Sequence, residues 1–237
     1  MKVSDIVKWT GAKCSGNVPE SCGAVSQDTR TMGLSALYVA LRGENADGHN
    51  FVADALARGA AAALVSDAWK VPPELSSAPL LRVRDPQRAL WDIARNWRQT
   101  FAMPKTRIVG LTGSSGKTTT REMIAALLAA KKAKVCATSG NFNNHIGLPL
   151  SILSMKPGCD FGVFETGVNH PGEMDGLADI LRPDAAVVTN IGTAHIEFFE
   201  TQEAIAREKG KLRAALPEDG FAVMDVDTAR FDTLRSQ

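Results

Sequence analysis

A glycine-rich segment at residues 110–120 (Gly-Leu-Thr-Gly-Ser-Ser-Gly-Lys-Thr-Thr-Thr) contains the residues best suited to bind a phosphate chain. The backbone N–H groups of such a loop can surround phosphate oxygens, and the positive end of the following helix dipole adds to the attraction. We expect Lys117 to reach the β- and γ-phosphates of a nucleotide and the Thr118 hydroxyl to bind Mg²⁺. The spacing departs from the strict G-x-x-x-x-G-K-S/T pattern, because Leu111 occupies the position of the first glycine and the early glycine is Gly113.

The segments on either side of this loop have the composition of a strand and a helix. Residues 107–109 are rich in β-branched side chains, and residues 121–128 are good helix formers. Strand, glycine loop and helix agree with one another, which favours a phosphate-binding loop over a glycine-rich turn that binds nothing.

Two polar residues that come at or after the ends of other predicted strands are candidates for the same site. Glu165 ends the apolar run at residues 161–164, and a carboxylate there is a natural ligand for Mg²⁺. The alternative is a strand-end carboxylate that meets solvent. His195 follows another predicted strand; a single histidine at such a place is more often a packed or capping residue than a ligand, and both interpretations stay open on spacing alone.

From residue 107 onward, predicted strands and helices alternate. This order indicates a mostly parallel sheet covered by helices on both faces. Ligands bind beyond the carboxyl ends of the strands in such sheets, so the polar residues that end these strands should gather around the phosphates. The strands are predicted at residues 108–112, 134–138, 161–166, 185–190 and 221–224, and the helices at residues 118–130, 172–181 and 202–216.

The first part of the chain is predicted to be a separate unit. Residues 1–84 contain two short apolar strands, at 36–41 and 60–65, with a polar loop at 42–50 that we expect to be exposed and a helix at 51–58. Residues 85–106 form a linker with a helix near 87–100. The predicted fold is therefore α/β: a small mixed α/β domain, then a P-loop domain with a mostly parallel sheet at residues 107–237, incomplete at its C-terminus.

Composition excludes several classes of function. The chain has 237 residues and a formal net charge of +1, which argues against nucleic acid as a partner. No signal peptide and no membrane span are predicted. The four cysteines (Cys14, Cys22, Cys136 and Cys159) form no C-x-x-C pair, and we expect them to be reduced thiols of a cytoplasmic protein.

Several ordered motifs extend over nearly the whole chain. They are at residues 112–119 (TGSSGKTT), 140–149 (GNFNNHIGLP), 165–174 (ETGVNHPGEM), 189–197 (TNIGTAHIE) and 206–212 (AREKGKL), with 26–30 (SQDTR) and 43–49 (GENADGH) in the first unit. With these motifs together, the chain resembles the Mur ligases of peptidoglycan synthesis, and within them the branch that adds D-Ala-D-Ala.

The resemblance implies an ATP-dependent amide ligase of the EC 6.3.2 type. Such an enzyme would transfer the γ-phosphate of ATP to the terminal carboxylate of UDP-MurNAc-tripeptide, and the amine of D-Ala-D-Ala would displace the phosphate from the resulting acyl phosphate. Two anions must meet in the first step, which requires cations such as Lys117 and Mg²⁺. The expected partners are these substrates and ATP, and the expected state is a monomer.

The resemblance also assigns residues to roles. Catalytic roles fall on Lys117, His195 and Lys209, and Mg²⁺ ligation falls on Thr118 and Glu165, with His195 at a second ion. ATP binding falls on Thr112, Gly113, Ser114, Ser115, Gly116, Lys117, Thr118 and Thr119. Substrate binding falls on Ser26, Thr29, Arg30, Asn45 and Ala46 in the uridine region, and on Thr138, Ser139, Asn141, Asn144 and Asn169 in the groove.

Lys209 has two interpretations. On sequence alone it is a solvated lysine of the 202–216 helix that pairs with Glu203 or Glu208. The resemblance instead implies a carbamylated lysine, which would require a neutral amine. Lys211 is the neighbour that could be mistaken for it.

Other functions stay open at this point. Mur ligases have a third domain, so this chain resembles an N-terminal part, and we expect little or no turnover from it alone. The alternatives are a ligase of the MurE type that adds a diamino acid, a non-catalytic nucleotide-binding fragment, a folylpolyglutamate synthase or cyanophycin-type ligase, and a small-molecule kinase. The uridine-type first unit argues against a folylpolyglutamate synthase and against a cyanophycin-type ligase.

Overall fold

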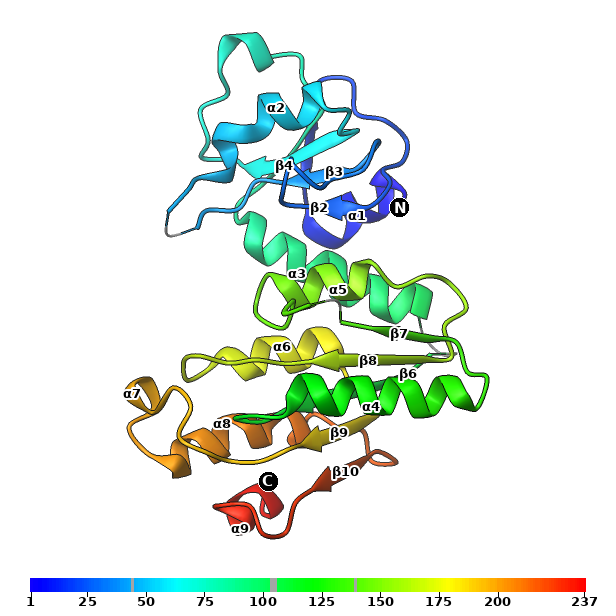
Figure 1. Cartoon of the computed structure of the whole chain (residues 1–237). Helices are drawn as coiled ribbons and strands as arrows, with labels where there is room; N and C mark the ends of the chain where they lie inside the picture. Colours follow the sequence, from blue (N-terminus) through cyan, green and yellow to red (C-terminus); the bar gives the residue numbers. More distant parts are fainter. Residues whose placement is uncertain (44, 103–105, 139) are drawn as a thin grey trace. The chain divides into compact units, whose positions relative to one another are not determined.

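The computed structural model describes every residue except Glu44, residues 103–105 and Ser139. It contains two compact units, Met1–Asn96 and Trp97–Gln237, each with its own five-stranded sheet (Figure 1).

The first unit has a mixed sheet in the order β1-β5-β4-β3-β2. Its β1 is antiparallel to β5, and the other neighbours are parallel. The strands are β1 (Lys13–Ser15), β2 (Val25–Ser26), β3 (Leu37–Val39), β4 (Ala62–Ser66) and β5 (Leu80–Val83). The helical elements are α1 (Val3–Thr10), η1 (Gly48–Phe51), α2 (Val52–Ala57), η2 (Pro73–Leu75) and α3 (Pro86–Trp97), the last of which crosses the unit boundary.

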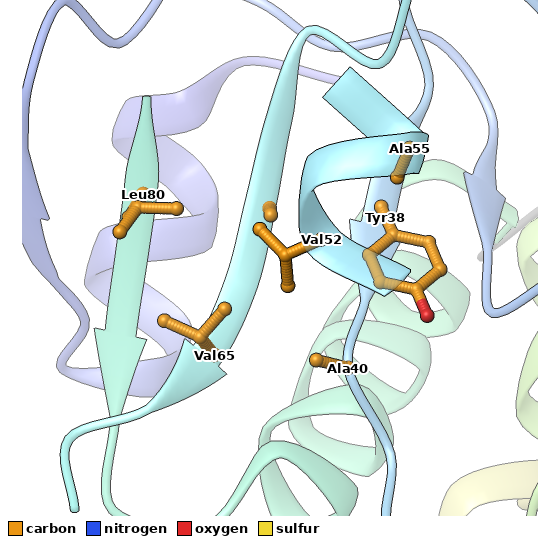
Figure 2. Close-up of a cluster of buried hydrophobic side chains, with 7 residues drawn as sticks. Tyr38, Ala40, Val52, Ala55, Val65 and Leu80 are labelled. Atoms are coloured by element: carbon orange, nitrogen blue, oxygen red, sulfur yellow. The ribbon is translucent and has the colours of Figure 1, made fainter. Parts of the chain in front are cut away.

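One part of the core of this unit forms where α2 packs on the sheet. Val52 and Ala55 of α2 belong to one buried cluster with Tyr38, Val65 and Leu80 of the strands (Figure 2). Four of the five residues of β4 are buried, as expected for a central parallel strand that is covered on both faces.

The loop at residues 42–50 is not wholly exposed, contrary to the sequence prediction. It includes the start of η1, where His49 is buried. The Nδ1 atom of His49 lies 2.6 Å from Asp47 Oδ1, and its Nε2 atom accepts a hydrogen bond of 3.0 Å from the backbone N–H of Ser66. Partners on both ring nitrogens let a polar side chain be buried here.

The second unit has a fully parallel sheet in the order β10-β9-β6-β8-β7, which confirms the predicted P-loop fold class. The strands are β6 (Arg107–Thr112), β7 (Val135–Ala137), β8 (Phe161–Glu165), β9 (Ala185–Val188) and β10 (Phe221–Met224). The helical elements are η3 (Arg98–Ala102), α4 (Lys117–Ala130), α5 (Gly147–Leu153), α6 (Glu173–Leu181), α7 (Ile196–Phe199), α8 (Gln202–Ala214) and α9 (Phe231–Arg235).

The central strand of this sheet is the one that leads into the glycine loop. β6 lies between β8 and β9 (Figure 1). Leu111 stands opposite Glu165 of β8 and Val187 of β9. All the strands run in the same direction, and their carboxyl ends therefore meet at one edge. This edge carries the candidate site.

The cysteine prediction is wrong for two of the four residues. Cys136 of β7 and Cys159 form a disulfide, with their Cα atoms 6.1 Å apart, while Cys14 and Cys22 are free thiols. β7 pairs in parallel with β8, and Cys159 lies two residues before β8 begins, so the two cysteines stand on adjoining segments of the sheet. A separation of 23 residues across a crossover gave no local sign of this pairing.

In the part of the chain that the structure describes, no helix is long and apolar enough to cross a membrane.

Candidate active site

The glycine loop is shaped by the segment that follows β9. Ser114 and Ser115 donate their backbone N–H groups to the carbonyl and side-chain oxygens of Asn190, at 3.1 and 3.0 Å. Gly113 has a φ of +150°, and a Cβ atom there would lie 1.9 Å from the side-chain oxygen of Thr189. Glycine is therefore required at this position both by the backbone conformation and by the close approach of Thr189.

The start of α4 supplies the donors for a phosphate. Gly116 precedes the helix with a φ of +77°, and the first backbone bond of the helix runs from Thr120 N–H to Gly116 O at 2.9 Å. The N–H groups of the first helical residues, Lys117 to Thr119, have no acceptor within a helix and point beyond its N-terminus. Together with the helix dipole they form an anion-binding end at the mouth of the loop.

Lys117 lies folded back over this loop. Its Nζ atom donates a 2.8 Å hydrogen bond to Gly113 O. Burial lowers the pKa of the Lys117 ammonium, and the negative charge of Glu165 partly opposes this effect. The ammonium is thus held within the loop and close to a carboxylate.

Glu165 is fully buried, so the interpretation of a carboxylate that meets solvent is wrong. Its Oε2 atom accepts hydrogen bonds from Thr118 Oγ1 at 3.3 Å and from Asn143 Nδ2 at 3.4 Å. Its Oε1 atom lies 2.9 Å from Nη1 of Arg121. The sequence predicted that Thr118 and Glu165 would meet at the sheet edge, and the structure confirms this.

The oxygens of Thr118 and Glu165 fit a magnesium ion. Adjacent ligands of an octahedral ion with bonds of 2.0–2.1 Å lie about 2.9 Å apart, close to the 3.3 Å between Thr118 Oγ1 and Glu165 Oε2. Among the described residues, no group of three or more His, Cys, Asp or Glu side chains could hold a metal. One carboxylate and one hydroxyl suit an ion that takes its other ligands from water and phosphate.

A cavity of about 160 Å³ next to the loop brings several predicted residues together. Lys117 borders it together with His195 and Lys209. His195 has a φ of +63° and precedes α7. The other lining residues are Gly113, Ser114, Asn143, Asn144, Gly167, Val168, Asn169 and Ala194.

Lys209 is 2% exposed, so the interpretation of a solvated lysine is wrong. The pKa of its amine is lowered to about 8, mainly by burial and next by the positive charge of Lys117, while the negative charge of Glu208 opposes both effects. Lys211 behaves differently: its Nζ atom lies 2.8 Å from carboxylate oxygens of both Asp175 and Glu208, and these bonds raise its pKa. Of these two lysines, only Lys209 borders the cavity beside the loop.

The remaining groove residues lie along the same edge. Thr138 Oγ1 accepts a hydrogen bond from Glu165 N–H at 3.1 Å, which joins the end of β7 to the end of β8. Asn144 Oδ1 accepts bonds from two N–H groups at the start of α5, at 2.8 and 3.1 Å. Asn169 N–H donates to Glu173 at 2.7 Å, and Asn141 is exposed. Ser139 lies outside the described residues.

The residues predicted for the uridine region belong to the first unit. Ser26 is on β2. The guanidinium of Arg30 donates two hydrogen bonds of 2.9 and 2.7 Å to Asp28, and the backbone N–H of Arg30 donates a third of 2.9 Å. Asn45 and Ala46 are exposed, and Thr29 is half-buried.

The sequence did not predict a role at the site for two residues. Arg121 contacts Glu165 from within α4, and Asn143 contacts it from the loop after β7. Asn143 lies within the motif at residues 140–149. Arg121 gave no signal, because an arginine in a helix is usually exposed.

Comparison with known proteins decides the family. Residues 111–237 match the family described as "Mur ligase middle domain", and residues 23–98 match "Mur ligase family, catalytic domain". The chain belongs to the Mur ligase family. The UDP-N-acetylmuramoyl-tripeptide–D-alanyl-D-alanine ligase of Escherichia coli K12 is 41% identical over 204 residues, which are 86% of this chain and 43% of that protein. The ligase of the same name from Bacillus subtilis 168 is 41% identical over 84% of this chain and 42% of its own length.

Solved structures agree with this assignment. A crystal structure of MurF from Acinetobacter baumannii covers 99% of this chain with a TM-score of 0.90 at 30% identity, and the match covers 51% of that structure. MurF ligase from Thermotoga maritima in complex with ADP covers 90% of this chain with a TM-score of 0.77 at 34% identity, over 47% of its own length. This Mur ligase chain spans about half the length of the relatives that it matches.

Proposed function

We propose that this chain provides the nucleotide-binding part of a MurF-type ligase, which joins D-Ala-D-Ala to UDP-MurNAc-tripeptide with hydrolysis of ATP. The observation that carries the proposal is the cluster of Lys117, Thr118, Glu165 and Lys209 at the carboxyl edge of the second sheet. Its relatives of 41% identity bear the name of this activity.

The chemistry of the cluster suits phosphoryl transfer between two anions. The first-turn N–H groups of α4 bind phosphate oxygens, and Lys117 moves its ammonium from Gly113 O to the transferring phosphoryl group. That charge is more effective in a buried site than in water, because little solvent screens it. The γ-phosphorus–oxygen bond breaks as the substrate carboxylate attacks, ADP leaves, and an acyl phosphate forms. The amine then attacks the acyl carbon, phosphate leaves, and the amine loses a proton.

Thr118 and Glu165 would hold the Mg²⁺ of the nucleotide, and His195 would contribute to a second ion. Bound there, Mg²⁺ supplies charge neutralisation for the phosphates. The residues proposed to bind the peptide substrate are Thr138, Ser139, Asn141, Asn144 and Asn169.

Lys209 is proposed to carry a carbamate. A pKa of about 8 leaves about half of its side chains neutral at pH 8, against fewer than about one in a hundred for an ordinary lysine. The neutral amine can attack CO₂, forming a C–N bond and releasing one proton. The carbamate is an oxygen-donor anion, which suits a hard cation.

Carbon NMR with isotopically labelled bicarbonate tests this modification directly. A carbamate signal should appear in the wild-type chain and in Lys211→Met, and should be absent from Lys209→Met. A signal that persists in Lys209→Met would contradict the assignment.

The uridine part of the substrate is proposed to bind the first unit at Ser26, Thr29, Arg30, Asn45 and Ala46. Substitutions of Thr29 and Asn45 should weaken binding of the UDP-precursor and leave ADP affinity unchanged. Calorimetric titration with each ligand separately measures both.

Calorimetric titration with ADP and Mg²⁺ tests the nucleotide site. Lys117→Ala should weaken binding at least tenfold, because it removes the charge beside the phosphates. Lys131→Ala is the matched control, since it removes the same charge from an exposed position just after the same helix. Equal affinities for wild type and Lys117→Ala would refute the proposed role of the loop.

A further inference from the structure

The helix after the glycine loop buries an arginine instead of an apolar side chain. In α4, which the structure describes from end to end, Arg121 is the only buried residue, at 4% exposure. Leu127 and Met123 of the same helix are exposed. An arginine is rarely buried without partners, so its contacts should explain its position.

The guanidinium of Arg121 connects three parts of the site. Nη1 lies 2.9 Å from Glu165 Oε1 at the end of β8 and donates a 3.0 Å hydrogen bond to Gly140 O in the loop after β7. Nη2 contacts the neighbouring Glu122 on α4. Among the described residues, Oε1 of Glu165 has no hydrogen-bond partner. Its polar contact is the ion pair with Nη1 of Arg121.

The two oxygens of Glu165 face different partners. Oε1 faces the guanidinium of Arg121, and Oε2 faces Thr118, where a metal ion fits. Asn143, three residues beyond Gly140, donates to the same Oε2 and accepts a bond of 2.8 Å from Gly167 N–H. The loop that carries Asn143 is therefore held at one end by Arg121 and near its middle by Glu165.

We propose that Arg121 is a positioning residue, which fixes the Glu165 carboxylate and the loop at residues 140–144 in one arrangement and so couples metal binding to the shape of the substrate groove. The inference rests on the proposed function for the metal, but the loop contact does not depend on it. A planar guanidinium with several donors in fixed directions can serve both partners at once.

Electrostatics alone would give the opposite expectation for the metal. The positive charge of a nearby guanidinium repels Mg²⁺, so removal of the guanidinium would strengthen the binding of Mg²⁺. The complete burial of Glu165 decides between the two effects, because a buried carboxylate without its counter-charge is unfavourable and loses its fixed orientation. Arg121 therefore helps metal binding by holding the ligand in place.

The test compares two variants of similar size in the whole chain. Arg121→Gln can still donate a hydrogen bond but has no charge. Arg121→Lys keeps the charge but lacks the planar guanidinium with its several N–H donors. Lys131→Gln is the control for the loss of one charge near the same helix. The first readout is amide hydrogen exchange of Gly167 without metal or nucleotide, since its N–H group bonds to the loop at Asn143. The second is the factor by which Mg²⁺ strengthens ADP binding.

We expect Gly167 to exchange at least fivefold faster in both Arg121 variants. The Mg²⁺ factor should fall at least tenfold in Arg121→Gln and stay within threefold of wild type in Arg121→Lys. Lys131→Gln should match wild type in both readouts. Wild-type exchange in either folded Arg121 variant, or tighter Mg²⁺-dependent binding in Arg121→Gln, would overturn the inference. A wild-type chain without any Mg²⁺ effect would instead refute the proposed metal site, and the exchange result would still decide the role of Arg121.

Discussion

Replacing Lys209 by methionine should stabilise this protein at neutral pH. The folded chain lowers the pKa of this amine from 10.5 to about 8, mainly by burial. One pKa unit corresponds to about 1.4 kcal/mol, so the charged lysine costs the folded state up to about 3 kcal/mol below pH 8. Methionine has a similar length and no charge, so the Lys209→Met substitution removes this cost.

The pH dependence of the gain distinguishes this cause from better packing. Below pH 8 the amine is charged in both the folded and the unfolded chain, and the full cost is present. Between pH 8 and 10.5 the folded state releases its proton first, so the free energy of unfolding of the wild type rises with pH. The advantage of Lys209→Met should therefore shrink steadily over this range.

Urea unfolding followed by circular dichroism measures this effect. The buffer must be free of CO₂, because a carbamate would change the charge of the wild-type side chain. Lys211→Met is the control: Lys211 gains ion pairs with Asp175 and Glu208, so its loss should lower stability by up to about 1 kcal/mol. The reasoning is refuted if Lys209→Met is no more stable than wild type at pH 7, or if its advantage is equal at pH 7 and pH 10.

Two further substitutions test the loop and the metal site. Glu165→Gln removes the carboxylate charge that we propose as a ligand of Mg²⁺, and should reduce the strengthening of ADP binding by Mg²⁺ at least tenfold; an unchanged factor in calorimetry would exclude Glu165 as the ligand. Gly113→Ala places a Cβ atom 1.9 Å from the Thr189 side chain, and should lower the free energy of unfolding by about 2 kcal/mol and abolish ADP binding, whereas wild-type unfolding and affinity would show that the loop adapts.

Local sequence patterns predicted the frame of the site. The glycine loop, its strand and its helix are contiguous in sequence, and the rule for carboxyl ends of parallel strands predicts Glu165 at the same edge as the loop. The apolar runs that became β6, β8 and β9 were long and regular enough to identify. These features depend on neighbours in the chain or on a general property of parallel sheets.

The features that sequence did not predict depend on distant partners. Arg121 is buried because Glu165 and Gly140 meet it from two other segments, and no helical pattern reports such an encounter. The Cys136–Cys159 disulfide depends on the register of β7 against β8. The depressed pKa of Lys209 likewise depends on how α8 packs against the edge of the sheet, so the sequence alone left its solvated interpretation open.

The most direct test of the proposed function is ADP release by the intact enzyme that contains this chain. The measurement supplies ATP, Mg²⁺ and UDP-MurNAc-tripeptide, and adds D-Ala-D-Ala, a diamino acid or no amine. We predict sustained ADP release only with D-Ala-D-Ala, because without this amine the acyl phosphate stays bound and blocks the next turnover. Equal release without an amine would indicate a kinase or an ATPase, and release with the diamino acid instead would indicate a ligase of the MurE type; either result would contradict the proposal.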